Sequence, residues 1–219
     1  TERVGLIGLP FPGVELKMVP AGPKYELRLR GVIVTPGYHG RPDLTAAAFD
    51  EEGFYKIGDA VRFIDPDRPE RGLMFDGRVA EDFKLSSGTW VNTGALRISA
   101  LAALAPIAQD AVVCGHDRDD IRLLVFANVP ACRTLLPDVP ADRPASELLQ
   151  HPALAALVRA GLQTLNATST GTSTRVTAVL LMAEPASQDA GEITDKGYIN
   201  QREVLSRRAA LVEALYGPQ

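Results

Sequence analysis

Three charged residues that stand directly beside glycines could take part in the chemistry of a nucleotide. They occur in Gly58-Asp59, Gly77-Arg78 and Lys196-Gly197. An aspartate can accept hydrogen bonds from ribose hydroxyls, an arginine can reach a phosphate or ribose, and a lysine can neutralise charge that develops on a phosphoryl group. A glycine lets the backbone approach a ligand closely. When each pair is taken alone, a turn or a solvated surface charge explains it as well or better.

A second group of candidates lies in DFKLSSGTWVN, which has the pattern of a β-hairpin with a Ser-Ser-Gly turn. Lys84 and the Ser86-Ser87-Gly88 turn are the parts of this segment that could face a ligand, and a solvated hairpin is the alternative. Arg78 could likewise be the partner in a surface ion pair. Lys196 lies in a polar loop, GEITDKGYINQ, between a buried strand pattern and an amphipathic helix. Most loop lysines are solvated charges, so this position needs support from elsewhere in the chain.

Residues that often bind metals or act as nucleophiles are scattered. His39, His116 and His151 lie far apart, without HxxxH or CxxC spacing, so we predict no metal site. Cys114 and Cys132 stand in apolar stretches, which indicates buried, inert thiols and a reducing compartment. The sequence contains neither a G-x-S-x-G nucleophile motif nor a glycine-rich phosphate loop ending in GK[ST].

Composition narrows the class of protein further. The chain has 219 residues, of which 46% are hydrophobic and 23% are charged, and its net charge is −4. These proportions are typical of a globular protein, and the negative charge argues against a nucleic-acid partner. No apolar run approaches the ~20 residues that span a bilayer, so we predict no membrane contact. The first residues lack the layout of a signal peptide, and we expect a cytoplasmic protein.

Residues 1–76 predict a small β-rich unit. The stretches VELKMVP, YELRLRGVIV and AVRFID alternate apolar and polar side chains, as half-buried strands do. Turn signals such as Pro36-Gly37 separate them. The stretch DLTAAAF predicts a short helix that Asp43 or Thr45 could cap.

Residues 77–219 mix strand patterns with amphipathic helices. A helix is predicted from TGALRIS through Gln109 with Thr93 as N-cap, and a later one with Ser146 as N-cap, which Pro152 interrupts or restarts. Strands are predicted at AVVCGHD, IRLLVFANV and VTAVLLMAEP, and one last helix follows Gln201. The predicted fold class is therefore α+β, with a small β-rich N-terminal segment followed by an α+β C-terminal domain.

The order and spacing of the candidate segments resemble the adenylate-forming superfamily of acyl-CoA synthetases, adenylation domains and luciferases. The pattern runs GYHGRPDLTAAAF, EEGFYKIGD, FDGRVAEDFKLSSG and GEITDKGYINQ, and the resemblance covers essentially the whole chain. Together these segments are much more specific than any single pair. The versions EDFKLSSGTWVN and EITDKGYINQREVL look most like the feruloyl-CoA synthetases, which activate hydroxycinnamic acids.

The resemblance implies a ligase with two half-reactions. A carboxylic acid, here ferulate or a related aryl acid, would attack the α-phosphate of Mg-ATP, and coenzyme A would then attack the acyl-adenylate after the C-terminal domain rotates. ATP and coenzyme A would be co-substrates, with no bound prosthetic group. By motif, Asp59 would bind the ribose and Arg78 the same nucleotide, and the hinge would lie at Val79 to Glu81. Lys84 and Gly88 would lie beside the pantetheine path.

The sequence departs from the family pattern at two positions. Many relatives have an acidic residue or lysine where this hinge has Ala80. The catalytic lysine of the family usually follows the glycine, near the place of Tyr198, whereas here a lysine precedes it. A phenol stays neutral at pH 7 and cannot supply the charge, so we assign the catalytic role to Lys196 and infer a two-residue shift of the loop.

The phosphate-binding loop and the acid-selecting pocket of the family have no counterpart here, and would belong to a large domain before Thr1. We therefore expect residues 1–76 to be the C-terminal part of the large AMP-binding domain and residues 77–219 to be the mobile lid domain. The chain alone should be inactive without that N-terminal partner. The alternatives are an adenylation enzyme that loads a carrier protein and a non-catalytic, stand-alone binding module.

Overall fold

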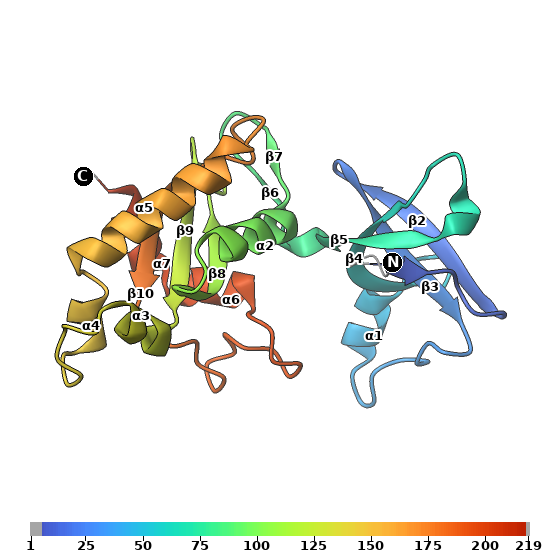
Figure 1. The fold of residues 1–219 in the computed structure, drawn as a ribbon. Helices are drawn as coiled ribbons and strands as arrows, with labels where there is room; N and C mark the ends of the chain where they lie inside the picture. The colour runs from blue at the N-terminus through green and yellow to red at the C-terminus, as the bar shows by residue number, and fades with distance from the viewer. Residues whose placement is uncertain (1–5, 218–219) are drawn as a thin grey trace. The chain divides into compact units, whose positions relative to one another are not determined.

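The computed structural model describes residues 6–217. The chain divides into two compact units, the N-terminal unit Thr1–Asp82 and the C-terminal unit Phe83–Gln219 (Figure 1). This boundary lies a few residues after the predicted start of the second domain at Gly77. The predicted fold class, a β-rich segment followed by a mixed α+β segment, is confirmed. The assignment of the two units to an AMP-binding domain and a lid domain stays a prediction.

In the residues that the structure describes, the N-terminal unit holds a five-stranded antiparallel sheet with the strand order β1-β5-β4-β3-β2. Its small core lies on one face and is built around Leu27, Val61 and Leu73. The elements are β1 (Leu6–Gly8), β2 (Val14–Ala21), β3 (Lys24–Gly31), α1 (Pro42–Ala48), β4 (Tyr55–Phe63), η1 (Pro69–Arg71), β5 (Leu73–Arg78) and η2 (Val79–Glu81).

Local sequence explains most of this sheet. Strands β2 and β3 form where the alternation predicts them, except that β3 ends at Gly31 and does not include the predicted Val32 to Val34. They join through the two-residue loop Gly22-Pro23, where Gly22 has the positive φ of 62° that a primed hairpin turn requires. Strand β4 begins before the predicted AVRFID stretch and therefore includes Asp59. The predicted caps of α1 are wrong, because Pro42 starts the helix and Arg41 is its N-cap. The hydroxyl of Thr45 instead donates to the carbonyl of Arg41.

The C-terminal unit is built on a sheet that has, within the described residues, three strands in the order β10-β9-β8. Strand β9 pairs antiparallel with β8 and parallel with β10. A separate short hairpin pairs β6 with β7. The elements are β6 (Phe83–Lys84), β7 (Trp90–Val91), α2 (Thr93–Ala103), β8 (Ala108–Cys114), β9 (Ile121–Ala127), α3 (Val129–Leu135), α4 (Ala145–Leu148), α5 (Pro152–Ala167), β10 (Val176–Met182), α6 (Gln201–Arg207) and α7 (Ala209–Tyr216).

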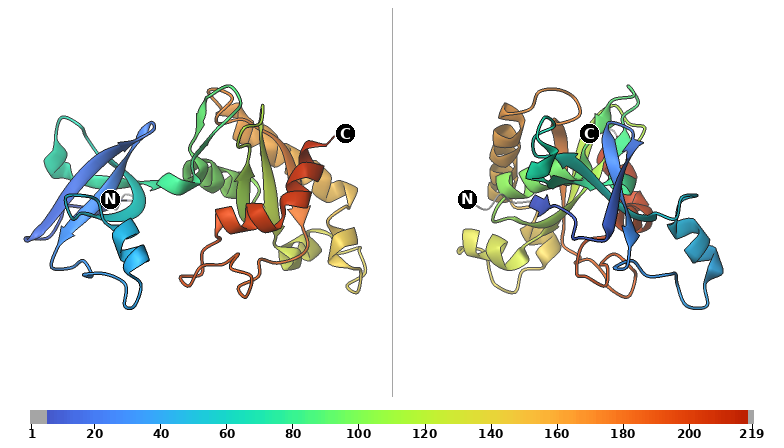
Figure 2. Two further views of the ribbon diagram at one scale, coloured as in Figure 1. Left: turned by 180° about the vertical axis from the view of Figure 1, so that it is seen from behind. Right: turned by 90° about the vertical axis from the view of Figure 1, so that its right-hand side faces the viewer.

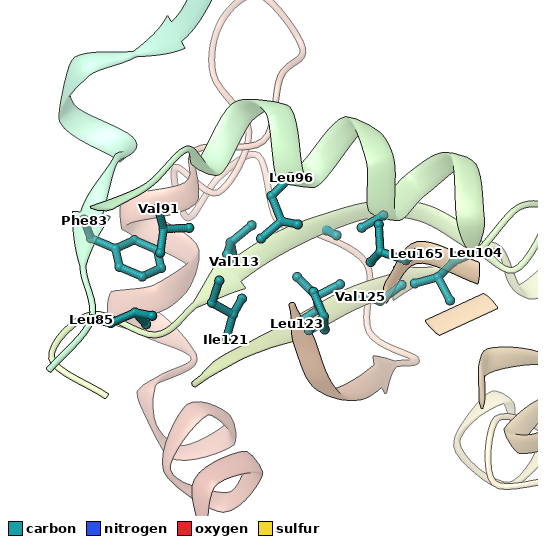
Figure 3. Packing of buried hydrophobic residues seen from close by; sticks show 13 residues of the cluster. Phe83, Leu85, Val91, Leu96, Leu104, Val113, Ile121, Leu123, Val125 and Leu165 are labelled. Carbon is teal, nitrogen blue, oxygen red and sulfur yellow. The ribbon is translucent and has the colours of Figure 1, made fainter. Parts of the chain in front are cut away.

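Helices cover both faces of this sheet. Helices α2 and α5 pack on one face, where the side chains of Figure 3 form the largest buried cluster. Helices α6 and α7 pack on the other face through Val204 and Leu215 (Figure 2). Alternate residues of β9, such as Leu123 and Leu124, enter opposite clusters. Because it is covered on both sides, this strand is an almost continuous apolar run.

Several predicted helix ends are corrected by the structure. The N-cap of α2 is Asn92, whose side chain accepts a hydrogen bond from the Ala95 amide, and Thr93 is the first helical residue. The same helix ends at Ala103 and does not reach Gln109, as a proline at position 106 requires.

The later helices differ from the predicted ones in a similar way. Ser146 lies inside α4 and is not an N-cap, because Pro144 occupies that position. Pro152 begins α5, so the predicted restart is confirmed. The final predicted helix is split at Arg208 into α6 and α7, and α3 was not predicted.

Candidate functional site

Asp59 and Arg78 form an ion pair on the N-terminal sheet. They are register partners on the neighbouring strands β4 and β5, with Arg78 Nε 2.9 Å from Asp59 Oδ1. The side chain of Arg78 is 50% exposed and that of Asp59 29%. Gly58 precedes the pair at a φ of 74°, beside a register irregularity in β4. Side by side, the carboxylate can accept hydrogen bonds from a polar ligand and the half-exposed guanidinium can donate hydrogen bonds to the same ligand.

The predicted hinge is a single 3-10 turn, η2. Arg78 before it and Asp82 after it both have extended backbone conformations. Asp82 is fixed to the sheet, because its carboxylate lies 2.5 Å from the Nζ of Lys24 and both side chains are 6% exposed. Lys24 also donates to the carbonyl of Asp76. A buried ion pair therefore holds the last residue of the N-terminal unit.

Lys84 and Gly88 lie on the β6–β7 hairpin of the C-terminal unit. The exposed ammonium of Lys84 stands 5.1 Å from the centre of the Trp90 ring, its partner across the hairpin. Gly88 has a φ of 80°, and its amide closes the turn on the carbonyl of Leu85. The hydroxyl of Ser86 donates to Asp119 at 2.6 Å, which ties the hairpin to the turn between β8 and β9.

Lys196 lies at the tip of a second small hairpin. An antiparallel bridge joins Ile193 to Ile199, and the amide of Gly197 donates to the carbonyl of Thr194 at 2.8 Å. This bond places Lys196 at an inner position of the turn, and its side chain is exposed. The sequence predicts a polar loop, and the structure shows that the loop is hydrogen-bonded and presents its lysine to solvent.

Two charged residues secure the base of this hairpin. The carboxylate of Glu192 is paired with the guanidinium of Arg208 at 2.8 Å, and both side chains are buried. The hydrogen bonds from Arg208 lower the pKa of Glu192 to about 2. Neither residue stands out in the sequence, because a charge that will be buried has the same local pattern as one that stays in solvent.

A cavity of about 490 Å³ opens in the C-terminal unit against the Lys196 hairpin. Its walls are mainly apolar, with the carboxylates of Asp110 and Glu184 among its few charged groups. Asp110 is held by two hydrogen bonds from Arg97, at 2.8 and 2.6 Å. The lining residues are Gln109, Asp110, Phe126, Ala127, Val129, Pro130, Met182, Ala183, Glu184, Pro185, Ala186, Ile193, Gly197 and Ile199.

The structure brings the candidate residues together in part. Asp59 meets Arg78 in one unit, Lys84 shares a hairpin with Gly88 in the other, and Lys196 has its own hairpin there. Their catalytic and binding roles stay predictions.

The two cysteines lie in the buried interior of the C-terminal unit. Cys114 and Cys132 are buried as predicted, and burial raises the pKa of the Cys114 thiol to about 12. In residues 6–217, no cluster of three or more His, Cys, Asp or Glu side chains could hold a metal ion. Across the same residues, no helix combines the length and the hydropathy that a transmembrane span needs.

Comparison with known proteins gives related enzymes but no matching family model. A carboxylic acid reductase of Segniliparus rugosus is 27% identical over 195 residues, which cover 89% of this chain and 15% of the reductase. A chloroplastic long-chain-fatty-acid–[acyl-carrier-protein] ligase of Arabidopsis thaliana is 24% identical over 227 residues, which cover 97% of this chain and 29% of the ligase. The chain thus spans less than a third of either relative.

The fold matches a solved adenylation domain. The A domain of the carboxylic acid reductase from Segniliparus rugosus, solved with AMP and a co-purified carboxylic acid, superposes with a TM-score of 0.68 at 25% identity. The match covers 95% of this chain and 32% of that domain. The finer resemblance to feruloyl-CoA synthetases stays a prediction. By sequence and by fold, the chain is similar to a segment of these adenylating enzymes.

Proposed function

We propose that this chain supplies part of the active site of an enzyme that adenylates a carboxylic acid with Mg-ATP and transfers the acyl group to coenzyme A. The observation that carries the proposal is the position of Lys196, an exposed lysine at the tip of a hairpin with a buried, charge-paired base. The adenylate-forming relatives support it. Ferulate or a related hydroxycinnamate is the proposed acid, on the strength of the segments EDFKLSSGTWVN and EITDKGYINQREVL.

In the first half-reaction, a carboxylate oxygen of the acid attacks the α-phosphorus of ATP. The bond from that phosphorus to the bridging oxygen of pyrophosphate breaks, which leaves an acyl-adenylate. Lys196 would stabilise the negative charge on the α-phosphoryl oxygens, because an ammonium placed where charge develops lowers the barrier. Asp59 would accept hydrogen bonds from the ribose hydroxyls, and Arg78 would donate to the same nucleotide.

In the second half-reaction, the thiol of coenzyme A attacks the acyl carbon and AMP leaves. The β6–β7 hairpin with Lys84 and Gly88 would line the path of the pantetheine arm. The turn η2 would act as the hinge between the two steps, since a few residues can absorb the change in dihedral angles that a domain rotation needs.

The alternative acceptor is the thiol of a carrier protein. It is favoured by the relative whose name is an acyl-carrier-protein ligase. Both acceptors carry a pantetheine thiol, so the same hairpin could serve either one. The chemistry of adenylation, and the proposed role of Lys196, would be identical.

The test is a product assay on the full gene product that contains this chain. Incubation with ferulate, Mg-ATP and coenzyme A should give feruloyl-CoA, AMP and pyrophosphate, identified by mass spectrometry. Ferulate-dependent release of pyrophosphate without a thioester would support the carrier-protein alternative. The absence of pyrophosphate release with a panel of aryl and aliphatic acids would contradict adenylation and favour a binding module.

A further inference from the structure

Arg208 occupies the break between α6 and α7 and binds the base of the Lys196 hairpin. Its Nε lies 2.8 Å from Oε1 of Glu192, and a terminal nitrogen lies 2.9 Å from Oε2. The side chains are 8% and 3% exposed. Two parallel charge-assisted bonds fix the carboxylate in orientation as well as in position.

The same guanidinium also holds the segment that leads into the hairpin. It donates to the backbone carbonyls of Pro185, at 2.9 Å, and Glu184, at 3.3 Å. Its Cζ atom lies over the ring of Phe126 on β9, 4.9 Å from the ring centre. Arg208 therefore links the sheet, the loop after β10 and the hairpin base.

Glu192 connects Arg208 directly to the hairpin. Its carboxylate accepts from the amide of Ser187 at 2.8 Å, and its own carbonyl accepts from the amide of Asn200 at 2.8 Å. The next pair along the chain is the bridge between Ile193 and Ile199, and the turn follows at once. A displacement of Glu192 would therefore displace the tip.

The other side of the hairpin base is held by Gln201. Its buried side-chain amide accepts from the backbone amide of Val113 at 3.1 Å and donates to the carbonyl of the same residue at 3.2 Å. Both ends of the hairpin are thus attached to the sheet. At the tip itself, the amide of Thr194 donates to the carbonyl of Tyr198, and the amide of Tyr198 donates to the hydroxyl of Thr194.

We infer that Glu192 and Arg208 are positioning residues that hold the hairpin so that Lys196 is presented at a fixed place. Buried ion pairs often contribute little net stability compared with apolar packing, so stability alone is a poor reason for this one. The bidentate geometry and the added carbonyl contacts of Arg208 instead fix the orientation of the Glu192 carboxylate and of the segment that leads into the hairpin. This inference rests on the proposed role of Lys196 in adenylation, and two separate measurements distinguish the two claims.

The first measurement needs no activity. Hydrogen exchange of the amides of Thr194, Gly197 and Asn200 is followed in the whole chain for wild type and Glu192→Gln. We expect exchange at these amides to rise about tenfold or more, with β9 unchanged, because removal of the ion pair frees the hairpin base. Unchanged exchange at the hairpin would overturn the inference. If Glu192→Gln fails to fold, Glu192→Asp keeps the charge and shortens the side chain, and the same increase is expected.

A matched control is Asp120→Asn. It removes another arginine-paired carboxylate of the same unit, bonded to Arg122 at 3.0 and 3.2 Å at the opposite end of β9 from Phe126. It should leave the hairpin amides at wild-type exchange. An equal increase at the hairpin in both variants would mean that any loss of charge loosens the unit, and would contradict a specific role for Glu192.

The second measurement is made on the full gene product. Glu192→Gln should lower kcat for adenylation about 10- to 100-fold, as misplacement of a catalytic group does, with KM for ATP almost unchanged. Arg208→Lys should lower kcat less than Arg208→Gln does, because the ammonium keeps one charged donor for the Glu192 carboxylate. Faster hairpin exchange with unchanged adenylation would support the positioning of the hairpin and contradict the catalytic role of Lys196.

Discussion

Asp59 and Arg78 face each other across β4 and β5, with Arg78 Nε 2.9 Å from Asp59 Oδ1. The sequence offers them as separate candidates, and the structure joins them as one polar site on the N-terminal sheet. The partly exposed position of both side chains suits a ligand more than a stabilising role, because exposed ion pairs contribute only about 0–1 kcal/mol.

Asp59→Asn should therefore change function without a large change in stability. The free energy of unfolding should fall by less than about 1 kcal/mol. KM for ATP in the full gene product should rise, because an amide makes a weaker acceptor for ribose hydroxyls than a carboxylate. Steady-state kinetics and urea denaturation check the two expectations.

The matched control for this variant is Asp65→Asn. Asp65 pairs with Arg71 at 3.2 Å in the same unit, and its side chain is 28% exposed, close to the 29% of Asp59. It should leave KM for ATP at the wild-type value. Equal KM values in the two variants would contradict a nucleotide-binding role for Asp59.

Gly88 should be required for its backbone conformation. Its φ is 80°, and a Cβ added there would meet no atom within 4 Å, so the cost of Gly88→Ala is backbone strain alone. We expect a loss of about 1–2 kcal/mol in the stability of the C-terminal unit. Gly171→Ala, also in open space but without a positive φ, should be close to neutral. Thermal unfolding measures the stability of both variants. Similar stabilities would contradict the requirement for glycine at position 88.

The Glu192–Arg208 pair should make the C-terminal unit sensitive to acid. Its carboxyl has a pKa lowered from 4.5 to about 2, so the folded state favours the ionised form. The pH-dependent part of the stability is fully present above pH 4.5 and decreases by about 3 kcal/mol as the pH falls toward 2, which is separate from the small net contribution of the pair relative to apolar packing. Denaturant unfolding between pH 5 and pH 2 should show a shallower pH dependence in Glu192→Gln than in wild type. Parallel curves for the two proteins would contradict this assignment.

Lys24 should stabilise the N-terminal unit by its buried pairing with Asp82. Lys24→Met removes one member of a buried ion pair, for which a loss of about 3–5 kcal/mol is typical. Lys17→Met is the control, because the Lys17 side chain is 27% exposed and its pairing with Asp50 lies nearer the solvent. Urea unfolding should show the larger loss for Lys24→Met. A smaller loss there would mean that Asp82 is not held by this lysine.

The sequence predicts the strands of the sheets better than the ends of the helices. Alternation of apolar and polar residues predicts β2 and β3, because one face of each strand is buried. The strand β5 was missed, since LMFDGR is short and ends in a glycine and an arginine. The break at Arg208 was also missed, because the apolar spacing of the last helix continues through it.

The candidate site was predictable where local motifs carry it. Asp59, Arg78 and Lys196 stand out because each adjoins a glycine in a segment with a family-like pattern. The contacts that hold them are not local, since Glu192 lies in the loop after β10 and its partner Arg208 lies between α6 and α7, 16 residues further along the chain. No spacing in the sequence distinguishes this buried arginine from its exposed neighbour Arg207.

The most direct test of the catalytic role of Lys196 measures the two half-reactions separately in Lys196→Ala, made in the full gene product. Adenylation, measured by ATP–pyrophosphate exchange, should fall by about 100-fold or more, because a preorganised positive charge is lost. Thioester formation from supplied feruloyl-adenylate and coenzyme A should stay at the wild-type rate, and Tyr198→Phe should leave both steps unchanged. Equal loss of both half-reactions in Lys196→Ala, or loss of adenylation in Tyr198→Phe alone, would contradict the assignment of Lys196.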